Sequence, residues 1–425
     1  MMEHSKLYDL SKNQVAPILC DYVYWVLKCA KARGIQTLYF LARDGYVLKQ
    51  IAEIICKEKK IKIICKYLYC SRASLRMPSY HIIDKAEAYD LLFLGGYHVS
   101  LKSILDRAEI PQAKRNIILQ ECGFPLSIDL NQERSYSEIQ NYRHNFEKSN
   151  HFYQIVIQNS KQAYPETIAY FSQEGLFHQD TIGIVDSGWT GSMQRSLRQL
   201  LQSAGYQGKI TGFYFGMYQE PKSSEDGEYL CWYFSSGKNK WNKILFCNNL
   251  FECFLSAPHG MTLAYQRCGL KSEPVLAPPL SEKETNLVKT QISGILDGTK
   301  RYINFLNVSC KKSEAILRKL MAFPDQTTSQ IYGEFLFCDD ITESYQLVLV
   351  DRSQMQILKQ YILPIRIACK FIRKEKSFTE LYWPFGMVAQ IKNPLLRGWY
   401  RFNLILWQWL KYTLGYANKK RKENG

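Results

Sequence analysis

The residues best suited to chemistry lie in the segment TIGIVDSGWTGSMQR, at positions 181–195. An apolar run predicts a strand over residues 182–185 that ends at Asp186. Four small residues follow in a predicted tight turn, namely Gly188, Thr190, Gly191 and Ser192. The helix expected next would offer free N–H groups and a dipole to a phosphate. The Asp186 carboxylate is suited to hold a metal ion or sugar hydroxyls; the alternative is a turn that serves only the fold.

A second unit of the same design lies near the N-terminus. The sequence TLYFLARDG predicts an apolar strand over 37–41, and apolar residues at helical spacing follow over 46–55. Another strand is predicted over 61–69. The polar or small residues that follow these two strands are Arg43, Asp44, Gly45, Ser71 and Arg72.

The ends of the three predicted strands define one candidate site. Ligands of open parallel sheets bind outside the carboxyl ends of the strands. We therefore expect Arg43, Arg72 and Asp186 to face the same ligand. Arg72 and Arg76 are candidate phosphate clamps, although a solvated helix start explains them equally. Likewise, Arg43 and Asp44 alternatively cap a helix or pair with each other.

One further loop offers an acid and a base. Glu252 and His259 flank the sequence CFLSAP, and the two side chains are candidates for acid–base catalysis. A histidine beside Pro258 and Gly260 in a turn is also commonly structural. Both interpretations stay open at this point.

Composition limits the class of protein and of partner. The 425 residues include 46% hydrophobic and 22% charged residues, which is typical of a globular protein. The formal charge of +16 favours anionic partners, and nucleic acid is the weaker option because no recognition module is legible. Thirteen irregularly spaced cysteines, with no signal peptide, predict reduced thiols in the cytosol and no zinc site.

The C-terminal segment is a candidate membrane-contact element. Residues 395–416 are strongly apolar and aromatic, and basic residues follow at 419–422. Charged residues interrupt the run, so a spanning helix is not predicted. Such a helix either lies in the lipid headgroup region or packs as a buried helix on the domain.

The order of elements predicts an α/β fold with a doubly wound, mostly parallel sheet of Rossmann-like or phosphoribosyltransferase-like type. We expect a ligand-binding core over 12–220 with a helical insertion at about 84–175. A turn-rich extension over 221–280 follows a polar hinge at 221–228. Residues 281–425 form a mainly helical C-terminal region with a basic tail.

Four motifs give a family resemblance. LYFLARDG, YCSRASLR, IVDSGWTGSMQ and FECFLSAPHGMTLAY occur in this order within residues 15–280. Together they resemble the predicted haloacid-dehalogenase-superfamily hydrolases encoded among bacterial capsule and lipopolysaccharide O-antigen genes. The chain lacks the Asp-x-Asp-x-Thr motif of the phosphatase part; its nearest match, Asp186–Thr190, has glycine in place of the second Asp. Aspartyl-phosphate chemistry is therefore not carried over.

A more distant resemblance is to phosphoribosyltransferases. These also place an acidic strand end and a Thr-Gly-x-Ser/Thr loop before a helix, and Asp186–Ser192 falls in that order. Only one acidic residue precedes the loop here, and Asp44 is the candidate for a second carboxylate.

The resemblances imply a cytosolic protein of bacterial surface-polysaccharide biosynthesis that binds a phosphorylated or nucleotide-linked sugar. Thr190, Gly191 and Ser192 would cradle phosphate, and Arg43 and Arg72 would neutralise it. Mg²⁺ held by Asp44 or Asp186 is expected, and no organic cofactor is. The alternatives are a phosphoribosyltransferase-like transferase and a non-catalytic adaptor that docks glycosyltransferases at the inner membrane.

Overall fold

The computed structural model describes residues 2–94, 99–219, 227–337, 347–371 and 381–423. Its centre is a five-stranded sheet in which every neighbouring pair is parallel. The strands are β1 (Thr37–Leu41), β2 (Ile64–Leu68), β3 (Thr181–Trp189), β4 (Lys209–Met217) and β5 (Glu228–Phe234). The prediction of an α/β fold is thus confirmed.

The order of the strands is β2-β1-β3-β4-β5, so the direction in which the chain adds strands reverses between β1 and β3. These two strands pair in register, with Phe40 opposite Val185. Connections leave the two strands toward opposite sides at such a reversal, which opens a crevice at their carboxyl ends.

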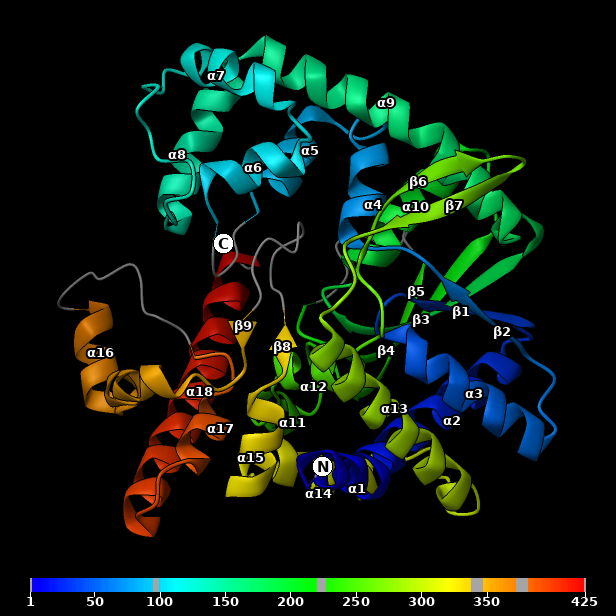
Figure 1. Ribbon diagram of the computed structural model, residues 1–425, viewed down its shortest axis with the longest axis vertical. Coiled ribbons are helices and arrows are strands. Elements are labelled where there is room, and N and C mark those ends of the chain that lie inside the picture. Colours follow the sequence, from blue (N-terminus) through cyan, green and yellow to red (C-terminus); the bar gives the residue numbers. More distant parts are fainter. Residues whose placement is uncertain (1, 95–98, 220–226, 338–346, 372–380, 424–425) are drawn as a thin grey trace.

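Helices cover both faces of the sheet because successive side chains of each strand point to opposite sides. Leu38 and Phe40 pack in one apolar cluster with α2 (Ala16–Ala32) and α3 (Gly45–Lys59). Tyr39 and Leu41 pack in another cluster with α10 (Ser192–Ser203). Figure 1 shows α2 and α3 on one side of the strands and α10 on the other.

The N-terminal helix is longer than predicted. The predicted helix over 12–33 is preceded by α1 (Met2–Leu10) and a π-helical segment, η1 (Ser11–Val15), which continue into α2. From α2, the buried Tyr22 hydroxyl donates hydrogen bonds to the backbone oxygens of Asp186 (2.9 Å) and Phe213 (2.8 Å). This residue therefore ties the helix to the central strands β3 and β4.

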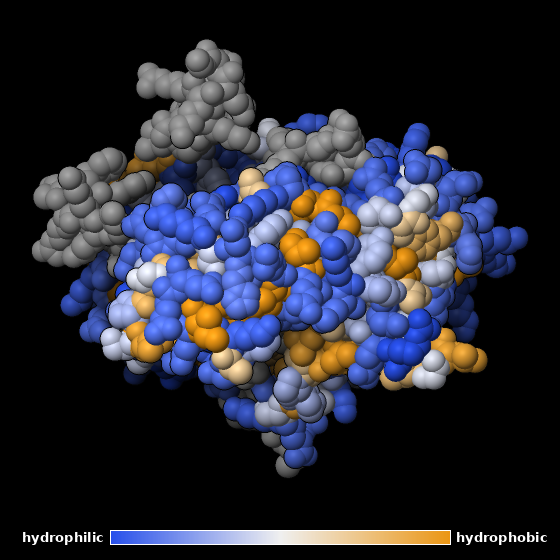
Figure 2. Space-filling model, turned by 90° about the horizontal axis from the view of Figure 1, so that it is seen from above, coloured by the Kyte–Doolittle hydropathy of each residue, from blue (hydrophilic) through white to orange (hydrophobic). Residues whose placement is uncertain are grey.

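The mainly helical segment expected between the second and third strands is present. It contains α4 (Arg72–Arg76), η2 (Met77–Ser79), α5 (Lys85–Leu92), α6 (Leu101–Arg107), α7 (Gln112–Glu121), α8 (Tyr136–Glu147), α9 (Asn150–Gln173) and η3 (Leu176–His178). We call residues 72–178 the helical insertion. It has its own apolar core, which includes Phe93, Phe146 and Phe152. The insertion arches above the sheet, and its outer face is mostly hydrophilic with separate apolar areas (Figures 1 and 2).

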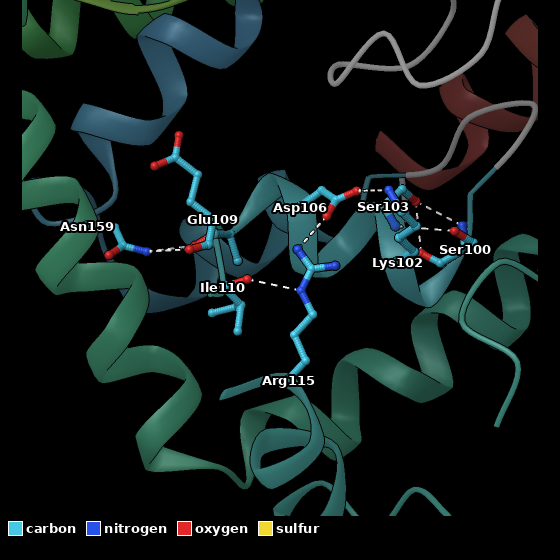
Figure 3. A network of polar contacts seen from close by, with 9 residues as sticks. Ser100, Lys102, Ser103, Asp106, Glu109, Ile110, Arg115 and Asn159 are labelled. Atoms are coloured by element: carbon cyan, nitrogen blue, oxygen red, sulfur yellow. Dashed lines mark hydrogen bonds and ion pairs between the residues drawn. The ribbon is translucent and has the colours of Figure 1, made fainter. Parts of the chain in front are cut away.

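Several charges within the insertion are paired. The Asp106 carboxylate accepts hydrogen bonds from Lys102 Nζ and Arg115 Nη2, both at 2.6 Å. Arg115 also donates through Nε to the backbone oxygen of Ile110, and Asn159 of α9 donates to the backbone oxygen of Glu109 (Figure 3). This network joins α6 to α7 and α9.

The part of the chain after residue 220 differs from the predicted extension. Its first strand, β5, is the edge strand of the main sheet, so the core extends past the expected boundary at 220. A hairpin of β6 (Thr262–Cys268) and β7 (Lys271–Leu276) then packs against α9 and α4. Residues 221–226 of the predicted hinge lie outside the described residues.

Helices dominate the remaining described segments, as predicted. The elements are α11 (Lys240–Ile244), α12 (Asn248–Phe254), α13 (Glu282–Tyr302), α14 (Lys311–Ala322), α15 (Gln326–Gly333), β8 (Leu336–Phe337), β9 (Leu347–Val348), η5 (Arg352–Tyr361), α16 (Leu363–Phe371), α17 (Pro384–Ala389) and α18 (Pro394–Glu423). An aromatic core joins them to the sheet: the ring centroids of Phe215 in β4 and Phe251 in α12 are 4.0 Å apart.

The C-terminal helix is partly buried and partly exposed. Tyr400 and Leu404 of α18 are buried, and the helix contacts α11, α16 and α17. Its other side is exposed: Leu395 is 86% exposed, Phe402 59% and Trp399 52%. Within the described residues, no helix combines the length and the hydrophobicity needed to cross a membrane.

Candidate functional site

Two carboxyl groups meet where the strand order reverses. Asp44 follows β1 and opens α3, and Asp186 lies in β3, next to β1 in the sheet. The Ser187 side chain hydrogen-bonds to the Asp44 carboxyl, and the charge of Asp44 acts on Asp186. The sequence prediction that these strand ends converge is therefore confirmed for the two aspartates.

Burial and the like charge together disfavour ionisation of this pair. Burial, then the charge of Asp44, and also that of Glu252, raise the pKa of Asp186 to about 8. The backbone N–H groups of Ser187 and Gly188 oppose this shift because they donate to the Asp186 carboxylate. Near pH 7, the pair therefore retains a proton and offers both an acid and a base.

Two arginines oppose the rise in the pKa of Asp44. Burial raises the pKa of Asp44, whereas the charges of Arg43 and Arg72 lower it. Both aspartates keep intermediate solvent exposure despite the burial penalty, as expected for groups at the base of a crevice. Arg72 is exposed at the first position of α4. A negatively charged ligand can thus reach the cations and the carboxyls.

A cavity of about 330 Å³ adjoins these groups. The charged residues of its wall are Arg43, Asp44, Glu252, Glu284 and Glu334. Much of the remaining wall is apolar and comes from the loop 277–280, from α13 and from β8. The site therefore adjoins a compartment large enough for a small organic molecule.

The predicted turn at Gly188 is wrong. β3 continues through Trp189, and Gly188 pairs with Gly216 of β4. Gly188 has φ +112°, and a Cβ there would lie 2.3 Å from the Gly216 oxygen. The glycine is required by this close approach of two strands, and the turn begins only after Trp189.

The start of α10 lacks a side-chain cap, and its predicted phosphate-binding role stays a prediction. Gly191 is its N-cap at φ +71° and offers no side chain to the helix N–H groups. Thr190 is exposed, and its hydroxyl donates to Ser192 Oγ at 3.4 Å. The first amides of α10 therefore have no cap from the N-cap side chain, which is the condition for an anion site.

Glu252 joins the site from α12. Its Oε1 accepts a 2.6 Å hydrogen bond from Trp189 Nε1, and its charge contributes to the raised pKa of Asp186. Trp189 in turn packs against Phe246 and Phe251, which fixes the end of β3 against the aromatic core.

His259 is connected to the site through a tyrosine that sequence reasoning missed. Its Nδ1 lies 2.8 Å from the Gly260 backbone oxygen, so this nitrogen carries the hydrogen. Nε2 then accepts from the Tyr67 hydroxyl at 2.9 Å. The charges of Asp44 and Arg43 in turn act on Tyr67, and burial raises its pKa. His259 thus has a structural partner and a link to the carboxyl pair.

Two other predicted site residues have structural contacts. The Ser71 hydroxyl donates to the Thr262 backbone oxygen at 2.6 Å and accepts from Ser74 N–H at 3.1 Å, which caps α4. Gly45 opens α3, where a Cβ would lie 2.5 Å from the Phe40 backbone carbon. Their phosphate-binding roles stay predictions, and Ser187, directly after Asp186, is a polar residue that spacing alone would have found.

The described residues contain no group of three or more His, Cys, Asp or Glu side chains arranged to hold a metal ion. Asp44 and Asp186 nevertheless provide oxygen donors of the kind that Mg²⁺ takes together with substrate phosphates. No protein-family model matches the chain, and no curated protein does either. The family resemblances therefore depend on the motifs alone.

Proposed function

We propose that the chain binds a phosphorylated or nucleotide-linked sugar in a Rossmann-like crevice and catalyses a hydrolytic or transfer reaction on it. The observation that supports this most is the pair Asp44 and Asp186 at the point where the strand order reverses. Carboxyl groups with raised pKa values in an accessible crevice are costly to the fold and are typical of sites that act on a ligand.

The two ends of the site suit the two parts of such a ligand. Arg43 and Arg72 provide positive charge, and the first amides of α10 provide N–H donors, so phosphate belongs on this side. The two carboxyl groups suit sugar hydroxyls. Asp186, protonated near pH 7, would act as the acid, and Asp44, beside two arginines, as the base.

Mg²⁺ is compatible with this arrangement. Asp44 and Asp186 would hold it together with phosphate oxygens of the ligand. When bound, the ion would neutralise phosphate charge and would bring both carboxyls to the ionised form. Hydrolysis and a phosphoribosyltransferase-like transfer would use the same residues, so the identity of the accepted ligand decides between them.

Ligand binding tests the proposal directly. Sugar phosphates, nucleotide sugars and phosphoribosyl pyrophosphate are titrated calorimetrically, with and without Mg²⁺. Asp186→Asn is expected to weaken binding of the accepted ligand at least about tenfold, the loss of a charged hydrogen bond. Asp180→Asn, exposed just before β3 at the opposite edge of the sheet, is the matched control and should bind as the unmodified chain does. Equal binding by both variants would contradict the proposal.

From the resemblance of the four motifs, we propose that this function belongs to the biosynthesis of bacterial capsule or lipopolysaccharide in the cytosol. Exchange of the native gene for Asp186→Asn is then expected to abolish the surface glycan while the protein still accumulates. Retention of the glycan would instead support a non-catalytic adaptor that docks glycosyltransferases.

The exposed face of α18 supports that second candidate, an adaptor at the inner membrane. Leu395, Trp399, Phe402 and Trp409 recur at intervals of four, three and seven, so they share one side of the helix. Arg397, Arg401 and Lys411 on the same helix suit anionic lipid. We expect the chain to sediment with phosphatidylglycerol vesicles but not with phosphatidylcholine vesicles.

A variant pair tests this contact. Trp399→Glu is expected to prevent sedimentation with anionic vesicles because it places a charge in the apolar face of α18. Ile117→Glu, on an exposed apolar residue of α7 in the helical insertion, is the matched control and should sediment normally. Normal sedimentation of Trp399→Glu would exclude the membrane contact.

A further inference from the structure

One buried arginine in the helical insertion has no partner. The Arg76 side chain at the end of α4 is 5% exposed, and its Nη1 has no hydrogen-bond acceptor. Within the described residues, its guanidinium forms no ion pair either. Nearly all buried charges in proteins are paired, so this group is either an unusual cost to the fold or one half of a pair that a ligand completes.

The charges that surround Arg76 are positive. Burial first, and then the charges of Arg72 and Arg107, lower its pKa to about 10. Arg107 is 9% exposed and comes from α6, where its Nη1 donates to the backbone oxygens of Leu92 and Leu94. Two other guanidinium groups, one from α4 and one from α6, thus make the charged form of Arg76 less favourable.

Two of the nearby acids form ion pairs with other residues. Asp106, one residue before Arg107, is held by Lys102 and Arg115 (Figure 3). Glu87 of α5 pairs with Arg195 of α10 at 2.7 Å. Glu109 has no ion pair among the described residues, and its carboxylate points away from the drawn network (Figure 3). Among the residues that the structure describes, no acid forms an ion pair with Arg76.

Arg72 connects this cluster to the carboxyl pair. Its charge acts on Arg76 on one side and on Asp44 on the other. α4, which carries both arginines, packs against α10, whose first turn is the proposed position of the first phosphate. A single ligand with two adjacent anionic groups would contact Arg72 through both of them.

We propose that Arg76, with Arg72 and Arg107, binds the second phosphate of a diphosphate-bearing ligand. This inference depends on the proposed function for the first phosphate, and it narrows the ligand class to nucleoside diphosphate sugars and related diphosphates rather than sugar monophosphates. A diphosphate supplies the acceptor oxygens that the buried guanidinium lacks, and arginine is suited to bind them in pairs.

The test compares two arginine substitutions in the full chain. Arg76→Met removes an unpaired buried charge, so the melting temperature without ligand is expected to stay the same or to rise. Its affinity for inorganic pyrophosphate should fall roughly ten- to hundredfold, while its affinity for orthophosphate stays within about twofold. Arg115→Met breaks the pair with Asp106, so it should lower the melting temperature and leave pyrophosphate affinity unchanged.

The outcomes separate this inference from the proposed function. Unchanged pyrophosphate affinity in Arg76→Met, or a fall in its melting temperature like that of Arg115→Met, would overturn the diphosphate site. Asp186→Asn and Arg43→Gln are measured in parallel with sugar phosphates. If those two bind normally while Arg76→Met loses pyrophosphate, the anion site stands and the proposed function fails.

Discussion

The network around Asp106 in the helical insertion and the carboxyl edge of the sheet differ in how their charged groups are arranged. In the insertion, Asp106 lies between Lys102 and Arg115, each 2.6 Å away. At the sheet edge, Asp44 lies close enough to Asp186 for its charge to oppose the ionisation of Asp186. Charges of opposite sign neutralise each other in the first region, whereas the second region holds like charges together.

The difference separates stability from function. A paired carboxylate that joins two helices stabilises the folded state, and this contribution is enough to account for its presence. Two adjacent carboxyl groups lower the stability of the fold at neutral pH and persist only because the surrounding structure holds them. Charges held at such a cost are the expected signature of a ligand site, which is why we assign function to the sheet edge and the adjacent arginines, and not to the paired charges around Asp106.

The largest change in stability that separates the two regions is expected from backbone strain at a glycine. Gly188→Ala is expected to lower the free energy of unfolding by about 2–5 kcal/mol because its Cβ would meet the Gly216 oxygen and because φ is +112°. Gly123→Ala, in the insertion, shares a positive φ of +78° but meets no atom within 4 Å. It should cost only about 1–2 kcal/mol. Urea denaturation of both variants measures the difference. Equal losses of the free energy of unfolding would show that the close approach of β3 to β4 adds nothing to the cost of Gly188→Ala.

Removal of one negative charge from each region should change stability in opposite directions. Asp106→Asn leaves Lys102 and Arg115 without a carboxylate and is expected to lower the free energy of unfolding by about 1–3 kcal/mol. Asp186→Asn relieves repulsion from Asp44 and should be neutral or stabilising at pH 8. Thermal denaturation at pH 8 compares the two. A loss of stability in Asp186→Asn as large as in Asp106→Asn would remove the distinction between the regions.

The sequence predicts which residues lie at the carboxyl edge of the sheet but not how far β3 extends there. Apolar runs followed by Arg43, Asp44 and Asp186 are visible directly, and parallel strands bring their carboxyl ends to one edge. The extent of β3 could not be predicted because the partner that Gly188 needs, Gly216, belongs to another strand. Glycine between small polar residues therefore suggested a turn.

Long-range contacts limited the rest of the prediction. β5 follows a polar segment, so its aromatic residues did not suggest a strand of the main sheet. The hydrogen bond between Tyr67 and His259 joins residues 192 positions apart. Arg76 lies at a position that an amphipathic pattern places equally well in solvent, and its burial depends on how the insertion packs. None of these partners can be found from local spacing.

The titration of Asp186 makes the stability of the fold depend on pH. The pKa of Asp186 is raised from 3.8 to about 8 in the folded state, so the folded chain binds its proton more tightly than the unfolded chain. Stability from this group is therefore present below about pH 4 and is lost as the pH rises toward 8, by up to about 1.4 kcal/mol per pH unit. The melting temperature of Asp186→Asn relative to the unmodified chain is expected to increase from pH 5 to pH 8.

Asp180→Asn is the control for this titration because Asp180 is exposed at the other edge of the sheet. Its melting temperature should follow that of the unmodified chain across the same range. A constant difference between Asp186→Asn and the unmodified chain would mean that the carboxyl pair does not titrate in this window.

The smallest expected effect concerns two histidines with similar hydrogen bonds. Tyr67→Phe removes the hydroxyl 2.9 Å from His259 Nε2, and Ser160→Ala removes the hydroxyl 2.8 Å from His81 Nδ1 in the insertion. Tyr67→Phe should lower the free energy of unfolding by about 1 kcal/mol, the net contribution of one hydrogen bond. Ser160→Ala should lower it by about 2 kcal/mol, because Ser160 Oγ also accepts from the His81 backbone N–H at 3.0 Å. Only Tyr67→Phe should also change the affinity for a phosphorylated ligand, because Tyr67 lies within the field of Asp44 and Arg43. If calorimetric titration shows the same affinity for both variants, His259 belongs to the framework of the fold and the candidate site ends at the carboxyl pair.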